Sequence, residues 1–223
     1  MITTNLNILA TAVGPHLYWL TSRAAGIAAL LLASMSVCLG LLMGGPLRTR
    51  KADLRIAHEA LSLATLAALV VHGLTLLGDG YLHPSLGDIA IPFLSGYRTL
   101  WTSMGIVAFW ALLVLGLSYY ARARIGVQRW RRLHRFAALA WLLGLAHSVG
   151  EGTDAGQAWF LAMLAVAAVP AIALLLGRLL RSAPSAASAT IATAPVGSSG
   201  ASVAQPGSRG VNQASVRPSS FAR

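Results

Sequence analysis

Four histidines lie in apolar segments of the chain, where ionisable side chains are rare. His58 and His72 are fourteen residues apart in one segment, and His134 and His147 are thirteen apart in another. Ionisable residues inside membrane-spanning segments are costly to bury and usually serve a function. Histidine is also a standard axial ligand of heme iron. The two matched pairs therefore predict heme ligation more strongly than a single packed histidine would.

The segments that carry these histidines belong to a set of five that are each long enough to cross a bilayer, which takes about 20 apolar residues. We expect helices at about 24–43, 54–77, 100–120, 133–149 and 158–176. Hydrophobic residues make up 56% of the chain and charged residues 10%, whereas soluble domains carry about one quarter charged residues. The fold class is thus an all-α membrane bundle, with one transmembrane domain at 1–181 and a kink expected at Pro170.

The basic residues between the segments predict the orientation, because cytoplasmic loops are rich in Lys and Arg. One side holds Arg48, Arg50, Lys51, Arg55, Arg122, Arg124, Arg129, Arg131, Arg132, Arg135, Arg178 and Arg181, and the other holds Arg23 and Arg98 with the acids Asp79, Asp88, Glu151 and Asp154. The N-terminus is therefore expected outside and the C-terminus inside. Residues 182–223 are rich in Ser, Ala, Gly and Pro, which predicts a disordered cytoplasmic tail.

In this topology the second and fourth helices run in the same direction, so their histidines can be compared by depth. The rise from His58 to His72 is about 21 Å, and from His134 to His147 about 20 Å. His58 is then level with His134 near the cytoplasmic face, and His72 with His147 near the outer face. Each level offers two axial nitrogens, which predicts two hemes b stacked across the bilayer.

The spacing of thirteen raises a geometric problem, because an ideal helix leaves His134 and His147 about 140° apart in azimuth. Either the helix tightens locally toward a 3₁₀ winding, with Gly144 as a weak point, or the two hemes are rotated relative to each other. Zinc is a weaker alternative, since the two histidines of each helix are about 20 Å apart and cannot meet at one ion. With only Cys38 present, neither a disulfide framework nor a Cys-x-x-Cys-His attachment of c-type heme exists.

Four arginines are candidate partners for heme propionates, since guanidinium binds carboxylate in a fork. Arg23 and Arg98 start helices on the outer side, and Arg131 and Arg135 flank His134 on the inner side. Interfacial anchoring explains the outer two equally well, and topology alone accounts for the inner two.

Helices 54–77 and 133–149 resemble the ferric reductase-like transmembrane domain of ferric reductases, NADPH oxidases and the heme-binding subunit of the periplasmic methionine sulfoxide reductase system. The resemblance covers about residues 16–180 and rests on the four histidines, with Trp130, Arg131, Leu133 and Arg135 around His134. The NADPH oxidase branch has the same spacings of fourteen and thirteen. The resemblance implies that the four histidines are the axial ligands of two hemes b. Many family members have six helices where five are counted here, and the oxidases' dehydrogenase domain is missing.

The expected function is a b-type cytochrome of the plasma membrane, surrounded by lipid, that passes electrons to an outer acceptor. The chain has no Gly-rich nucleotide motif, so a separate flavoprotein or quinol must donate the electrons. The net charge of +11 falls in short clusters between apolar segments, which excludes nucleic-acid binding. The alternative is a non-catalytic heme sensor or a structural subunit of a membrane complex.

Overall fold

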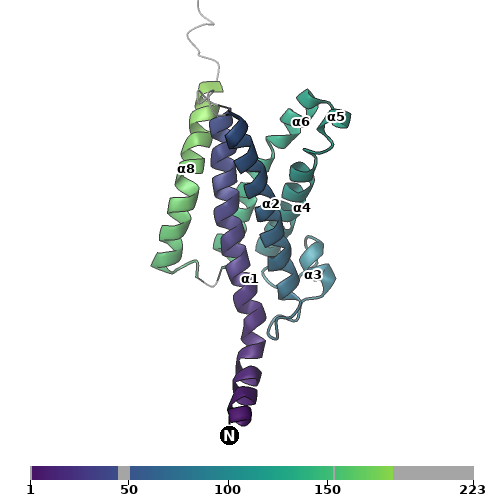
Figure 1. The fold of residues 1–223 in the computed structure, drawn as a ribbon, viewed down its shortest axis with the longest axis vertical. Coiled ribbons are helices and arrows are strands. Elements are labelled where there is room, and N and C mark those ends of the chain that lie inside the picture. The colour runs from purple at the N-terminus through teal and green to yellow at the C-terminus, as the bar shows by residue number, and fades with distance from the viewer. Residues whose placement is uncertain (1, 45–50, 153, 183–223) are drawn as a thin grey trace, which may run out of the picture. The chain divides into compact units, whose positions relative to one another are not determined.

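The computed structural model describes residues 2–44, 51–152 and 154–182, and all regular elements in these ranges are helices. They are α1 (Ile2–Met43), α2 (Lys51–Leu76), α3 (Leu86–Ala90), α4 (Thr99–Leu117), α5 (Arg122–Ile125), α6 (Val127–His134), α7 (Ala137–Glu151) and α8 (Ala158–Ser182) (Figure 1). The predicted all-α class is confirmed. The predicted tail, apart from Ser182 at the end of α8, lies outside the described residues.

Four helices in the described part of the chain are long and apolar enough to cross a membrane. These spans are His16–Met43 of α1, Ala52–Leu76 of α2, Thr99–Leu117 of α4 and Ala158–Arg181 of α8. They correspond to the first, second, third and fifth predicted segments. The helix of α1 begins at Ile2, well before the predicted start, and α8 continues through Pro170.

The fourth predicted span, 133–149, is not one continuous helix. α6 ends at His134 and α7 begins at Ala137, with a turn between them. In this turn the Phe136 N–H donates to Leu133 O at 3.0 Å and the Ala138 N–H to Arg135 O at 3.3 Å. The break marks the change from arginine-rich α6 to apolar α7. The prediction of a single span is therefore wrong at its inner end.

This turn also bears on the azimuth of the two histidines. Bonds to the third preceding residue wind the chain about 20° further per residue than an α-helix does, so the turn closes part of the expected gap of about 140°. Local tightening was one of the two alternatives that the spacing left open, with Gly144 as the weak point, but Gly144 lies inside regular α7. The structure places it at residues 133–138 instead, where the apolar sequence begins.

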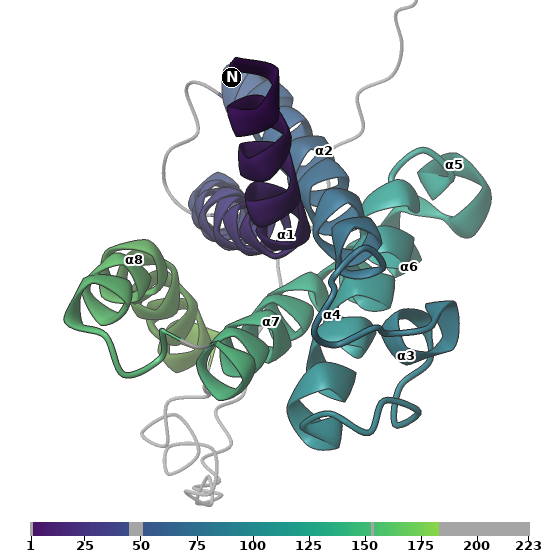
Figure 2. The ribbon, with the colours of Figure 1, turned by 90° about the horizontal axis from the view of Figure 1, so that it is seen from below.

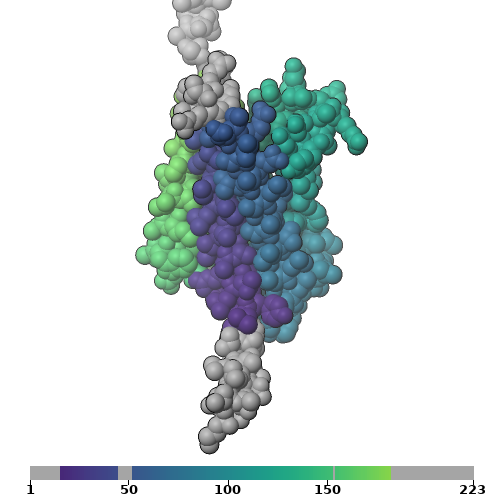
Figure 3. Space-filling model, viewed as in Figure 1, coloured from purple at the N-terminus to yellow at the C-terminus, as the bar shows by residue number. Residues whose placement is uncertain are grey.

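α1 is the central helix and packs against α2, α7 and α8. On the far side of the bundle α4 packs along α7 and also contacts α2. The view along the helices shows α7 between α8 and α4 (Figure 2). In the space-filling view α8, α1 and α2 lie side by side with their side chains in contact (Figure 3). The histidine-bearing helices α2 and α7 are thus held by two common neighbours, α1 and α4.

The best-packed core lies where α1, α7 and α8 meet. It contains Leu30, Ala33, Trp141, Leu145, Ala168 and Ala171. Trp141 is 1% exposed, and its indole N–H donates to the buried Ser34 Oγ at 3.0 Å. Small residues on α1 and α8 let the helices approach closely, as is usual in membrane bundles. This core fixes α7, and with it His147, against α1.

Residues 77–98 connect α2 to α4 through a loop that contains the short helix α3. Asp79 shapes its start, because Asp79 Oδ1 accepts hydrogen bonds from the backbone N–H groups of Tyr81 at 2.8 Å and Leu82 at 3.4 Å. Ser85 and Asp88 form a capping box that begins α3. The Trp110 indole N–H donates to Ala90 O at 2.8 Å and so ties the end of α3 to α4.

Candidate functional site

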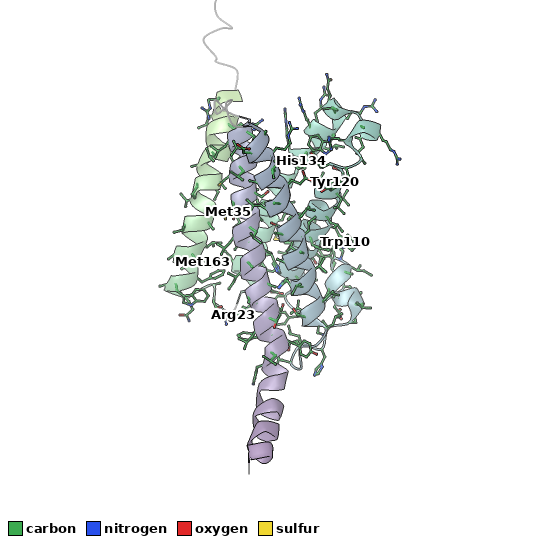
Figure 4. The ribbon with its side chains drawn as sticks, in the orientation of Figure 1. Arg23, Met35, Trp110, Tyr120, His134 and Met163 are labelled. Carbon is green, nitrogen blue, oxygen red and sulfur yellow. The ribbon has the colours of Figure 1, made fainter. Side chains whose placement is uncertain are left out.

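The structure brings the four histidines together in the two predicted pairs, across the space between α2 and α6–α7. The ring centroids of His58 and His134 are 6.1 Å apart, and those of His72 and His147 are 6.4 Å apart. His134 lies near one end of the bundle, and Arg23 of α1 lies toward the opposite end (Figure 4). Arg23 marks the level of the other pair, because it follows Ser22, whose backbone oxygen contacts His72. The pairs therefore form two levels, as the matched depths predicted.

The centroid separations fit a metal held between two imidazoles. A metal–imidazole bond is about 2 Å and a ring nitrogen lies about 1.1 Å from its centroid, so two opposed ligands have centroids about 6.3 Å apart. Both pairs lie close to this value. The described residues contain no group of three His, Cys, Asp or Glu side chains placed to share a metal ion. A structural zinc site needs about four such ligands, so the donor set fits axial ligation of heme better.

Each histidine has its Nδ1 atom beside a backbone carbonyl oxygen of a neighbouring helix. The distances are 2.9 Å from His58 to Ser36 O, 2.8 Å from His72 to Ser22 O, 2.9 Å from His147 to Trp101 O and 3.4 Å from His134 to Leu115 O. A carbonyl only accepts, so Nδ1 carries the proton and Nε2 keeps its lone pair. Metal-ligating histidines commonly donate their other N–H in this way, which fixes the tautomer and orients the ring.

Three glycines allow these helices to come close to the histidine rings. A Cβ added at Gly26 would lie 3.0 Å from His72 Nδ1, and one at Gly105 would lie 2.7 Å from His147 Nδ1. At Gly40 it would lie 3.3 Å from His58 Cε1. Side chains at these positions would push the rings out of their places. The glycines are thus part of the cradle that holds the histidines.

These supporting residues form a pattern that reasoning from the histidines alone missed. α1 contains Ser-x-x-x-Gly twice, at Ser22 and Gly26 and again at Ser36 and Gly40, fourteen residues apart. That is also the spacing of His58 and His72 on α2. The two serines are almost fully buried, at 2% and 6% exposed. A repeated small-residue motif with the histidine spacing was a signal that the first helix faces both levels.

A cavity of about 830 Å³ surrounds the pair formed by His72 and His147. Its walls are mostly apolar and come from α1, α2, α4 and α7, with Trp141 among them. Gly73 and Gly144 line it, and a Cβ added at either would meet nothing within 4 Å. Binding pockets for cofactors and small molecules typically have volumes of about 300–1,000 Å³. The cavity is thus large enough for a prosthetic group at this level.

The two outer arginines already contact protein groups. Arg23 lines the cavity and forms an ion pair with Asp154, and its guanidinium lies 4.9 Å from the ring centroid of Trp19 and 5.7 Å from that of Trp159. Arg98 has a left-handed backbone and donates a hydrogen bond to Gly150 O. The structure thus brings Arg23, but not Arg98, to the cavity wall.

Around His134 the sequence supplies an aromatic stack. The ring of Trp130 is stacked on that of His134 at 5.0 Å between centroids, and its N–H donates to Ser118 Oγ at 3.1 Å. Tyr119 contacts Trp130, and the Arg122 guanidinium lies 4.0 Å from the centroid of Tyr119. Arg131 and Arg135 are exposed on and just after α6. These contacts hold the inner histidine near the arginine-rich end of the bundle.

The comparisons with known proteins agree with the geometry. The family model described as "Ferric reductase like transmembrane component" matches residues 25–145, more than half of the chain. The match includes three of the histidines and ends two residues before His147. No curated protein and no solved structure shows a significant match. This multi-pass membrane chain, with two facing histidine pairs inside a helical bundle, therefore belongs to the ferric reductase-like transmembrane family.

Proposed function

We propose that the chain is a b-type cytochrome that carries electrons across the plasma membrane through two bis-histidine hemes. A separate donor on the cytoplasmic side, a flavoprotein or a quinol, supplies the electrons, and an acceptor on the outer side takes them. The observation that carries the proposal is the pair of facing imidazoles at each level, at 6.1 and 6.4 Å. Membership of an oxidoreductase family supports it.

In this function the bound hemes supply the one-electron chemistry. His58 and His134 would hold the inner iron, and His72 and His147 would hold the outer one. The carbonyl groups beside Nδ1 hold the proton on that atom and leave each Nε2 lone pair available to a metal. A carbonyl partner also raises the basicity of the ligand, which favours the ferric state of a bound iron.

The two histidine levels are expected at different depths in the bilayer. Fourteen residues of α2 separate His58 from His72, a rise of about 21 Å within a hydrocarbon core of about 30 Å. Each level thus lies close to one membrane surface. In the proposed complex Arg23 would bind an outer propionate, and Arg131 and Arg135 would bind inner ones. For Arg23 this means sharing its guanidinium with Asp154. Arg98, which is not at the cavity wall, could do so only by giving up its hydrogen bond to Gly150 O.

We expect the purified protein to contain two hemes b per chain, both low-spin, because each level offers two strong-field nitrogen ligands. A pyridine hemochrome assay against protein concentration gives the ratio, and the visible and electron paramagnetic resonance spectra give the spin state. A ratio of one or none, in protein expressed with sufficient heme, would contradict the proposal. The zinc content of the same sample tests directly the alternative that the histidines bind zinc.

The proposed direction of transfer requires the levels to face opposite sides of the membrane. A cysteine at Ser85, before α3, should react with a membrane-impermeant maleimide in intact cells, whereas one at Gln128, on α6, should react only after lysis. Both positions are exposed. The unmodified chain, whose Cys38 lies inside α1, is the matched control and should stay unlabelled. The reverse labelling would exchange the inner and outer levels.

A further inference from the structure

The outer end of the 830 Å³ cavity is acidic. Among the charged side chains that line it, Asp79, Asp88, Glu151 and Asp154 are acids and Arg23 is the one base. Two of these acids have partners that account for them. Asp154 is paired with Arg23, and Asp88 Oδ2 accepts hydrogen bonds from Ser85 N at 2.8 Å and Ser85 Oγ at 2.7 Å. Asp79 and Glu151 differ from these two because each has one carboxyl oxygen without a hydrogen-bond partner in the described structure.

Asp79 is 3% exposed, and one of its oxygens is without a hydrogen-bond partner in the described structure. Its Oδ1 atom accepts the two backbone hydrogen bonds that shape the loop, but Oδ2 is buried and unpaired. A buried carboxylate oxygen without a donor costs stability. Because Asp79 lines the cavity, a ligand there can satisfy this oxygen with an O–H or N–H group.

Glu151 is the last residue of α7, and its Oε2 atom is likewise buried and unpaired in the described structure. Its Oε1 atom accepts a hydrogen bond from Thr102 Oγ1 at 2.5 Å. Burial raises the pKa of the Glu151 carboxyl, although the Thr102 hydrogen bond and the charge of Arg98 act in the opposite direction. Burial thus favours the protonated acid, whose Oε2 can donate to a ligand oxygen.

The other ionisable groups around this end of the cavity do not replace these two. Arg98 donates to Gly150 O, His72 and His147 use their Nδ1 protons on carbonyls, and Arg23 is held by Asp154. Tyr81 and Tyr97 also line the cavity. No three metal-ligating side chains meet among the described residues, so a metal ion is a poor ligand here.

From these observations we infer that the outer end of the cavity binds a neutral organic acceptor with reducible carbonyl oxygens. Glu151 gives protons to the ligand as it is reduced, and Asp79 Oδ2 accepts a hydrogen bond from the hydroxyl that forms. The inference rests on the proposed electron transfer and names its acceptor class. The apolar walls of the cavity suit the carbon frame of such a ligand. The protonated Glu151 Oε2 suits a carbonyl oxygen of the ligand, and Asp79 Oδ2 suits the hydroxyl that forms on reduction.

The reaction balances with components already named. Reduction of a conjugated dione such as menadione to its dihydroxy form takes up two electrons and two protons. The two C=O double bonds become single bonds, a C=C bond forms in the ring, and two O–H bonds form. Both electrons would be supplied through the heme that His72 and His147 would hold, and the cytoplasmic donor is their source. Glu151 releases its proton to the ligand oxygen, takes another from outer water and releases that one in the second step. An acceptor that needs no protons, such as a metal complex, makes no use of Glu151.

The test compares two oxidants on the same reduced protein. The heme-loaded protein is reduced, freed of reductant and mixed with menadione or with ferricyanide, which accepts one electron and no proton. General acid catalysis contributes about 10²–10⁴-fold, so Glu151→Gln should slow oxidation by menadione at least tenfold and leave the ferricyanide rate unchanged. Asp79→Asn should weaken the binding of menadiol, the reduced product whose hydroxyl donates to Oδ2, and not that of menadione, which has no hydrogen to donate. Asp88→Asn, a cavity acid that already has its donors, should change neither rate.

A second readout does not depend on turnover. Infrared pH titration of the protein should show a protonated carboxyl band that persists above the ordinary range of glutamic acid and that Glu151→Gln removes. Equal effects of Glu151→Gln on both oxidants, or an unchanged infrared band, would overturn the inference while leaving the two hemes in place. If the protein contained no hemes, the proposed function would be overturned instead. The infrared band of Glu151 and the binding of menadione to that protein would still test whether the cavity binds such a ligand.

Discussion

Replacing His72 or His147 with alanine is expected to remove the same heme, the outer one, and to leave the inner heme spectrally intact. His58→Ala and His134→Ala should do the opposite. The reason is the pairing of rings across α2 and α6–α7, at 6.4 Å for the outer level and 6.1 Å for the inner one. Each variant should lower the heme content from two per chain to about one, or convert one heme to high spin, since one axial nitrogen remains.

Hemochrome assays and low-temperature spectra of the four variants measure this result, and electron transfer across proteoliposomes should stop in all of them. His16→Ala is the matched control, because His16 is exposed on α1 and far from both pairs in sequence; it should keep both hemes. If His58→Ala and His147→Ala removed the same heme, the two levels would be wrongly assigned. If every variant lost both hemes, the levels would not be independent sites.

Gly105→Ala is expected to weaken the outer heme although it removes no ligand. The added Cβ would lie 2.7 Å from His147 Nδ1, and the ring cannot turn away without breaking its hydrogen bond to Trp101 O. Disturbing the outer shell of a metal ligand typically costs about 10- to 100-fold in affinity or activity. We therefore expect a loss of outer heme on dilution, with the inner heme retained.

Heme retention after dilution or after incubation with apomyoglobin measures this effect. Gly116→Ala is the matched control on the same helix, since its Cβ would make an ordinary contact of 3.5 Å with Leu66 Cδ1. The control should behave like the unmodified protein. Equal heme retention in both variants would show that the close approach of α4 to His147 has no part in ligation.

The levels of the histidines were predictable because depth in a helix depends only on the count of residues. The arginines in the loops predict which side of the membrane each helix end faces, and the labelling of cysteines at Ser85 and Gln128 tests that prediction. The supporting contacts were harder to predict. Knowing that Ser22 lies beside His72 requires the register of α1 against α2, and sequence spacing within one helix does not contain it. The repeated Ser-x-x-x-Gly pattern of α1 indicates that register, but only when its spacing is compared with that of the histidines on α2.

The break at Arg135–Phe136 was missed for a different reason. No glycine or proline lies between Leu133 and Leu143, so the sequence near Arg135 contains neither of the residues that most often end a helix. The turn coincides with the change from the arginine-rich sequence up to Arg135 to the apolar sequence after it. The unpaired oxygens of Asp79 and Glu151 could not be predicted from the sequence either, because one lies in a loop and the other at a helix end, and both line one cavity only in the folded chain.

The fourteen-residue spacing occurs on three helices, and it limits where insertions and deletions can be tolerated. His58 and His72 on α2, Ser22 and Ser36 on α1, and Trp101 and Leu115 on α4 are all fourteen apart. One codon inserted between the members of any pair turns one of its residues about 100° around the helix axis. The alignment with the neighbouring helix is then lost at one level and kept at the other. Insertions and deletions should therefore accumulate in the connecting loops, while these three intervals keep their length.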